Sequence, residues 1–111
     1  MLSNSSCPKT MRSISDALEA LEGKWKLLIL VSLSSGPKRF KQISREVKGI
    51  TDKMLSKELK NLEMNQLIRR EVFESFPPTV EYSITEHGQS LEKVLEELHL
   101  WGLAHRQKVI G

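Results

Sequence analysis

The fold is decided between residues 39 and 62, which read RFKQISREVKGITDKMLSKELKNL. In the first part, Phe40, Ile43 and Val47 recur at steps of three and four, which indicates a short amphipathic helix. Gly49 then supplies a turn, and Thr51 is a residue type that caps helix N-termini. The same spacing resumes after it, at Met54, Leu55, Leu59 and Leu62. The stretch therefore predicts two helices joined by a tight turn.

The outer face of the second helix is polar and mostly basic. Its outward residues are Asp52, Lys53, Ser56, Lys57, Lys60 and Asn61. An exposed basic helix that follows a short helix and a tight glycine turn is typical of a helix-turn-helix, here over residues 39–65. The second helix of such a pair is the one expected to read a duplex.

The charge of the chain is concentrated around this stretch. The whole chain carries 17 Lys/Arg and 14 Asp/Glu, a formal net charge of +3. Residues 36–70 hold ten Lys/Arg and four Asp/Glu, a net of +6, whereas residues 1–35 have a net of +1 and residues 71–111 a net of −4. A basic middle third favours a polyanion on one face, nucleic acid first of all. Charge alone leaves a solvated lysine-rich surface open as the alternative.

Two further helices are predicted before the helix-turn-helix. Cys7-Pro8 opens the first, because proline is favoured at the first helical position, and Gly23 ends it, which gives residues 7–22. Residues 25–33, WKLLILVSL, are apolar nearly all round and predict a central helix buried on most sides. Gly36-Pro37 stops that helix.

After the reading helix the apolar period changes to two. Residues 68–73 and 80–84 alternate, so residues 68–84 are predicted to form a hairpin. Its tip contains Pro77-Pro78, which cannot donate ladder hydrogen bonds and which fix the backbone in an extended form. We expect a stiff two-stranded wing.

The C-terminal segment predicts one last helix over residues 86–106. Thr85 is placed as its cap and Glu86 suits its first turn. At 1.5 Å per residue the helix spans roughly 30 Å, more than so small a core covers. We therefore expect its distal half to pack on a second subunit. Its apolar stripe is Leu91, Val94, Leu95, Leu98, Trp101 and His105.

Length and composition exclude several classes of protein. At 111 residues, with 39% apolar and 28% charged residues, the chain is expected to be one globular domain over residues 1–111. No apolar run reaches the roughly 18 residues that span a bilayer, and the polar start lacks the apolar segment of a secretory signal, so we expect a cytoplasmic protein without membrane contact. One cysteine and three histidines, of which His99 and His105 do not align on one helical face, predict no metal site. No catalytic motif is found, and we expect neither an enzyme nor a cofactor.

The predicted order of elements and several short motifs, in register over most of the chain, resemble the HxlR-type winged helix-turn-helix regulators of bacteria. The resemblance implies an α+β, mostly helical, winged helix-turn-helix domain with a two-stranded wing and flanking N- and C-terminal dimerisation helices. The motifs are Cys7-Pro8, Gly23-Lys24-Trp25, Gly36-Pro37-Lys38-Arg39-Phe40, Gly49-Ile50-Thr51, Pro77-Pro78, Val80-Glu81-Tyr82-Ser83-Ile84-Thr85 and Gly88.

The resemblance also implies where DNA binds, with the reading helix in the major groove and the wing near the minor groove or the backbone. It puts Thr51, Lys53, Ser56, Lys57 and Lys60 against DNA, Arg39 and Gln42 near the phosphates, and Pro77, Pro78 and Thr79 at the wing tip. Lysines mostly neutralise phosphate, so base reading is expected from the N-terminal turns of the helix, at Thr51, Ser56 and Lys53.

The same resemblance implies that the first and last helices form a dimer interface. The residues expected there are Met11, Ile14, Leu18, Leu95, Leu98, Trp101 and His105. One departure concerns the end of the reading helix, where the family usually has glycine and this chain has Asn65-Gln66. Asparagine tolerates the left-handed conformation, so Asn65 is expected to take that role.

Two interpretations of Cys7 stay open. In parts of the family an N-terminal cysteine at this position senses oxidants or electrophiles such as quinones, through an intersubunit disulfide or an adduct. The start of a helix and the nearby Lys9 form the electropositive setting that suits a reactive thiolate. The alternative is a small buried hydrophobe with no sensing role.

The sequence thus predicts a DNA-binding regulator, a repressor, that acts as a homodimer on an inverted repeat in promoter DNA. The alternative from another class is a winged helix that docks proteins, since fold does not fix function. A docking module has no need of a net charge of +6 over residues 36–70, so this charge favours DNA binding. RNA binding is disfavoured, because no exposed aromatic residues accompany the basic ones to stack on bases. The operator, the regulated genes and the effector, whether a small molecule or an oxidant, are left open.

Overall fold

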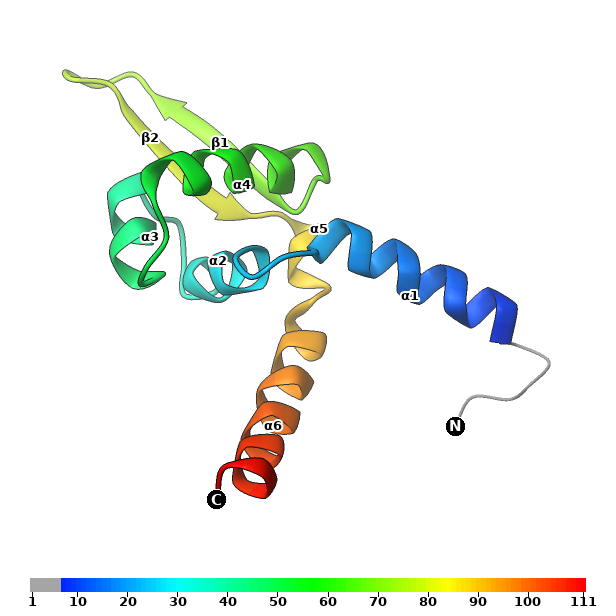
Figure 1. Ribbon diagram of the computed structural model, residues 1–111. Coiled ribbons are helices and arrows are strands. Elements are labelled where there is room, and N and C mark those ends of the chain that lie inside the picture. Colours follow the sequence, from blue (N-terminus) through cyan, green and yellow to red (C-terminus); the bar gives the residue numbers. More distant parts are fainter. Residues whose placement is uncertain (1–6) are drawn as a thin grey trace.

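The structure, a computed structural model, describes residues 7–111. Six helices and a two-stranded antiparallel sheet give a mostly helical α+β fold, as the sequence predicts (Figure 1). In chain order the elements are α1 Cys7–Leu21, α2 Lys26–Leu33, α3 Phe40–Glu46, α4 Asp52–Met64, β1 Ile68–Phe73, β2 Thr79–Ile84, α5 Glu86–Gln89 and α6 Glu92–Val109. None of these helices is both long and apolar enough to cross a bilayer.

The core lies among α2, α3, α4 and the base of the sheet. Ile29 and Leu30 of α2, Ile43 of α3, and Leu55 and Leu62 of α4 are fully buried. The apolar stripes read from the sequence for α3 and α4 are therefore confirmed. These helices pack together as one body, from which the wing projects on one side and α1 and α6 on the other (Figure 1).

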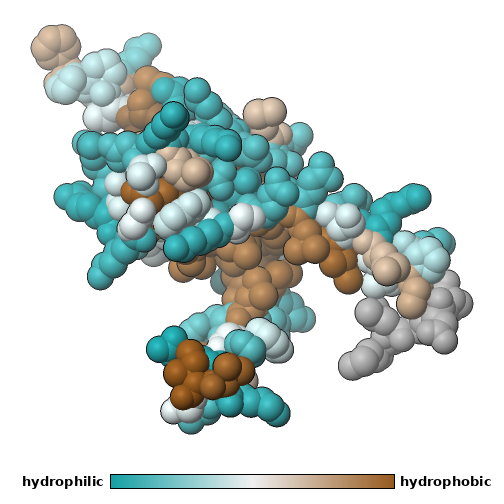
Figure 2. Space-filling view, in the orientation of Figure 1, coloured by the Kyte–Doolittle hydropathy of each residue, from teal (hydrophilic) through white to brown (hydrophobic). Residues whose placement is uncertain are grey.

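The prediction that the central helix is buried on most sides is only partly right. Leu28 and Val31 of α2 are 45% and 52% exposed. The reason is that α1 and α6 leave the core instead of covering it, and neither contributes a buried residue. Figure 2 shows apolar side chains gathered on the underside of the body, where these two helices depart.

The turn between α3 and α4 forms as predicted. Gly49 has φ +91°, a conformation that side chains rarely adopt. Ile50 is buried, and the Thr51 hydroxyl accepts a hydrogen bond from the backbone N–H of Met54 at 3.1 Å. The cap and the buried Ile50 together fix the direction in which α4 starts.

The end of α4 differs from the prediction for Asn65. Asn65 is not left-handed, with φ −85°, and the reversal falls at Gln66, with φ +61°. The Asn65 side-chain amide donates to the backbone oxygen of Asn61 at 3.0 Å, which closes the helix while Asn65 stays right-handed. The N–H of Gln66 then bonds to Glu63 O at 2.9 Å and that of Leu67 to Leu62 O at 3.0 Å, the Schellman pattern.

The wing is the antiparallel pair β1 and β2, in register from Ile68 opposite Ile84 to Phe73 opposite Thr79. The second strand begins at Thr79, one residue earlier than predicted. Lys38, just before α3, exchanges two backbone hydrogen bonds with Tyr82 of β2, at 2.9 and 2.8 Å. This bridge fixes the wing relative to α3.

The C-terminal helix is not the single helix predicted over residues 86–106. Thr85 caps only the four-residue α5, by accepting from Gly88 N at 3.0 Å, and the axis changes before α6. Gly88 is buried, and a Cβ there would lie 2.2 Å from the backbone oxygen of Leu67. Helix α5 is therefore seated against the turn after α4, and i to i+3 bonds from Ser90 and Leu91 redirect the chain.

Candidate nucleic-acid interface

The outer face of α4 carries the side chains that the sequence predicts for DNA contact. Lys53, Ser56, Lys57 and Lys60 are exposed and line one shallow groove on the helix surface. Asn61 and Met64 continue that groove toward the end of the helix. Thr51 is also exposed, but its oxygen already accepts the capping hydrogen bond, which leaves the hydroxyl proton free to donate.

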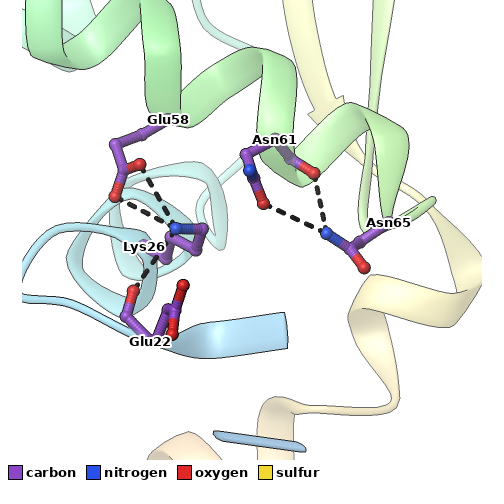
Figure 3. A network of polar contacts seen from close by, with 5 residues as sticks. All are labelled: Glu22, Lys26, Glu58, Asn61 and Asn65. Carbon is purple, nitrogen blue, oxygen red and sulfur yellow. Dashed lines mark hydrogen bonds and ion pairs between the residues drawn. The ribbon is translucent and has the colours of Figure 1, made fainter. Parts of the chain in front are cut away.

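The position of this face depends on a buried ion pair that the sequence analysis missed. The ammonium of Lys26 in α2 lies 3.2 and 3.3 Å from the carboxylate oxygens of Glu58 in α4, with 6% and 8% of the two side chains exposed (Figure 3). Lys26 also donates to the backbone oxygen of Glu22 at 3.3 Å. The pair joins the reading helix to the central helix on the side opposite the exposed lysines. The sequence contained one sign of this ion pair, because the acidic residue Glu58 lies on the same apolar stripe as Leu55 and Leu62.

A second group of predicted residues meets across the chain. Arg39 and Gln42, at the start of α3, line one groove with Pro77, Pro78 and Thr79 of the wing. The other lining residues are Phe40, Lys41, Arg45 and Val80. The groove therefore has an apolar floor and three cationic side chains from α3. Lys41 and Arg45 are members that sequence reasoning left out, because only the folded wing brings them into the set.

Gln42 has a structural role as well. Its side-chain oxygen accepts a hydrogen bond from the backbone N–H of Arg39 at 3.0 Å, which caps α3. The amide nitrogen of Gln42 stays available as a donor toward a phosphate.

The two helices of the pair are tied together at the start of α4. Asp52 lies 3.4 Å from the Lys41 ammonium and accepts from the Ser44 hydroxyl at 3.4 Å. Both members of the ion pair are well exposed, so the contact itself adds little stability. It does neutralise the acidic side chain at the start of the outer face of α4.

Glu46 anchors the other end of α3. Its carboxylate is held by Lys38 and accepts from the Ser32 hydroxyl of α2 at 3.0 Å. The Lys38 ammonium, followed by the Ser32 hydroxyl, lowers the pKa of Glu46. Since Lys38 also pairs with Tyr82, this acid links α2, α3 and the wing.

The residues predicted for a dimer interface lie mostly on exposed surface. Met11 and Leu18 of α1 are 71% and 64% exposed, and Trp101 of α6 is 66% exposed. The Trp101 ring stacks on the His105 ring, with the two ring centroids 4.8 Å apart. Leu95 differs, because it is half-buried against the core of its own chain. Ile14 and Leu98 are exposed like the others.

Cys7 is the first residue of α1 and carries a free, exposed thiol. The alternative that it is a buried hydrophobe is therefore wrong for the single chain. Within residues 7–111 no three His, Cys, Asp or Glu side chains come together in a way that would hold a metal ion.

Comparison with known proteins gives one consistent answer. The model of a family described as HxlR-like helix-turn-helix matches residues 20–109. The HTH-type transcriptional regulator YtcD of Bacillus subtilis is 42% identical over 99 residues, which cover 89% of this chain and 79% of YtcD. YodB of the same organism, also an HTH-type transcriptional regulator, is 38% identical over 100 residues, covering 90% of this chain and 86% of YodB.

Solved structures are similar over most of the chain. The redox regulator HypR in its reduced form superimposes with a TM-score of 0.81 at 36% identity, over 85% of this chain and 93% of HypR. A structure of HypR in its oxidised form gives a TM-score of 0.79 at the same identity, over 83% of this chain and 95% of HypR.

Proposed function

Because the chain belongs to the HxlR-like helix-turn-helix family, whose members compared above are transcriptional regulators and not enzymes, we propose that it is a homodimeric repressor that binds an inverted repeat in promoter DNA. The observation that carries the proposal is the exposed basic face of α4. Lys53, Lys57 and Lys60 stand on a helix whose opposite side is fixed to the core by Leu55 and the Glu58 ion pair. A rigid, exposed, basic helix is what major-groove binding needs.

The roles of the residues follow from where they lie. We assign Lys53, Lys57 and Lys60 mainly to phosphate neutralisation, and Thr51 and Ser56, in the first turns of α4, to base edges. Arg39 and Gln42 face the groove toward the wing and are assigned to the phosphate backbone. We assign the wing tip, formed by Pro77, Pro78 and Thr79, to the same DNA strand.

The dimer is supported by apolar surface that one chain leaves uncovered. Met11, Ile14 and Leu18 are exposed along α1, and Leu98 and Trp101 along α6. Contiguous exposed apolar faces on two protruding helices mark an interface. We infer that α1 and α6 of two copies pack together, with Leu95 and His105 at the edges. A two-fold dimer presents two reading helices, and this matches an inverted repeat.

Repression is the simpler sign of regulation, because occupation of a promoter blocks transcription without a further contact. We also propose the cytoplasm as the site of action, since promoter DNA lies there in bacteria. The alternative of a protein-docking winged helix has no observation in its favour, and the net charge of +6 over residues 36–70 argues against it.

Selection of duplexes from a random library by the reduced protein tests the proposal. We expect enrichment of an inverted repeat whose half-sites lie about one helical turn, or a small multiple of one, apart. A single enriched half-site without symmetry would contradict the dimer. Failure to enrich any sequence would favour the docking module.

A second proposal concerns regulation through Cys7. It is supported by the exposed thiol and by the similarity to HypR, described as a redox regulator. Oxidation would join the Cys7 thiols of two subunits as a disulfide, with loss of two electrons and two protons to an oxidant. Diamide can serve as that oxidant, because its N=N bond takes up both the electrons and the protons.

We expect diamide to convert the wild-type protein to a linked dimer on non-reducing gels and to change its affinity for the selected duplex. Cys7→Ser should show neither effect and should bind as the reduced wild type does. If diamide changes neither the gel mobility nor the affinity of the wild type, Cys7 is no sensor.

A further inference from the structure

The tip of the wing carries a side chain without any protein contact to explain it. Phe76 is 104% exposed, more than any other large apolar residue of the described chain. It lies between Ser75 and Pro77, in the loop that joins β1 to β2. This end of the hairpin points away from the core (Figure 1). Removal of a fully hydrated phenylalanine side chain from water is favourable, so a partner that covers Phe76 is favoured.

The backbone of the tip is ordered in a way that presents this ring. The N–H of Ser75 bonds to Phe73 O at 3.0 Å, and the Ser75 hydroxyl donates to Pro77 O at 2.7 Å. Pro77 and Pro78 restrict the following backbone. The backbone that carries Phe76 is therefore restricted before any partner binds, which reduces the entropic cost of a contact.

The surroundings identify the partner by its chemistry. The groove beside the tip contains Arg39, Lys41 and Arg45 of α3, so a phosphate backbone bound there passes next to the wing. The outer part of the wing, residues 71–83, has Glu71, Glu74 and Glu81 and no cation, whereas Arg69 and Arg70 lie at the base of β1. The tip therefore cannot attract DNA by charge, and any affinity it adds has to come from apolar contact.

This inference rests on the proposed function. We propose that Phe76 is a minor-groove wedge: its side chain inserts at a base step flanking each half-site, partly unstacks that step and bends the duplex. Apolar wedges of this kind, phenylalanine among them, kink DNA toward the major groove. The α3 cations offset the repulsion between the wing glutamates and the phosphates. Sequence preference then arises at positions that α4 does not touch, because flexible pyrimidine–purine steps unstack most easily.

The test uses the full chain and the duplex recovered by selection, labelled at its ends for energy transfer and carrying 2-aminopurine at the flanking steps. Wild-type protein should shorten the end-to-end distance and raise 2-aminopurine fluorescence. Phe76→Ala should lose both signals and bind about 100-fold more weakly, since it removes one base-stacking side chain, worth about 10-fold, from each subunit. Its salt dependence should match that of the wild type, because no phosphate contact is removed.

Val72→Ala is the matched control, since Val72 is an exposed apolar residue of the same hairpin that lies within β1 and not in the loop that carries Phe76. The Val72→Ala variant should match the wild type in end-to-end distance, 2-aminopurine fluorescence and affinity. Phe76→Trp should retain the wedge. The proposal is overturned if Phe76→Ala matches the wild type in affinity and bend, or if it loses affinity while the bend stays. A change in the sedimentation of the free Phe76→Ala dimer would assign the ring to a protein interface instead. Failure of the wild type to bind any duplex would instead remove the proposed function itself.

Discussion

Substitution of Lys26 by methionine should lower the free energy of unfolding by about 3–5 kcal/mol. The substitution leaves the Glu58 carboxylate buried without its cation, since only 8% of that side chain is exposed. An uncompensated buried charge costs far more than the pair contributes. Urea denaturation at a fixed protein concentration measures the loss, as a midpoint lowered by about 1–3 M.

Two controls separate the ion pair from general effects of the substitution. Lys48→Met removes an exposed lysine and should leave the midpoint nearly unchanged. The double variant Lys26→Met/Glu58→Leu should recover most of the lost stability, because apolar residues replace a buried pair at little cost. A single variant as stable as the wild type would show that the Glu58 carboxylate is not isolated from water.

The parts of the fold that follow from local patterns were predictable. The spacing of Leu55, Leu59 and Leu62 defines a buried stripe whatever it packs against, and Thr51 is a cap by its residue type. The exposed basic face of α4 follows from that stripe, because residues off it point to solvent. This is why the sequence alone predicts most residues of the candidate site.

Features that depend on contacts between distant residues were not predictable. Lys26 and Glu58 are 32 positions apart, and nothing local assigns the lysine a buried partner. The groove between α3 and the wing exists only because Lys38 pairs with Tyr82. The break before α6 likewise comes from the close approach of Gly88 to Leu67 O, a tertiary contact that overrides the apolar spacing of the last helix.

The largest effect on function is expected from Lys57→Glu. Lys57 lies in the middle of the exposed face of α4 and, within residues 7–111, forms no ion pair with a carboxylate. A reversed charge replaces attraction to phosphate by repulsion in both subunits, so affinity should fall roughly 10-fold or more for every duplex, specific or not. Fluorescence anisotropy with the selected duplex and a scrambled one measures the change.

Lys108→Glu provides the matched control. It makes the same change in net charge, but at the exposed end of α6, far from the groove on α4. We expect it to bind within about twofold of the wild type, because only charges within a Debye length of the DNA contribute strongly. Equal losses from both substitutions would mean that net charge, and not the face of α4, governs binding.

The central claim is that the basic face of α4 holds DNA through its phosphates. The measurement that tests it most directly is the dissociation constant for a duplex, taken over a series of salt concentrations for the wild type and Lys57→Glu. The account predicts a steep linear fall of log affinity with log salt, about 0.9 per phosphate neutralised, and a slope shallower by about 2 for the variant, one contact in each subunit. A flat salt dependence, or the same slope in both proteins, would contradict it.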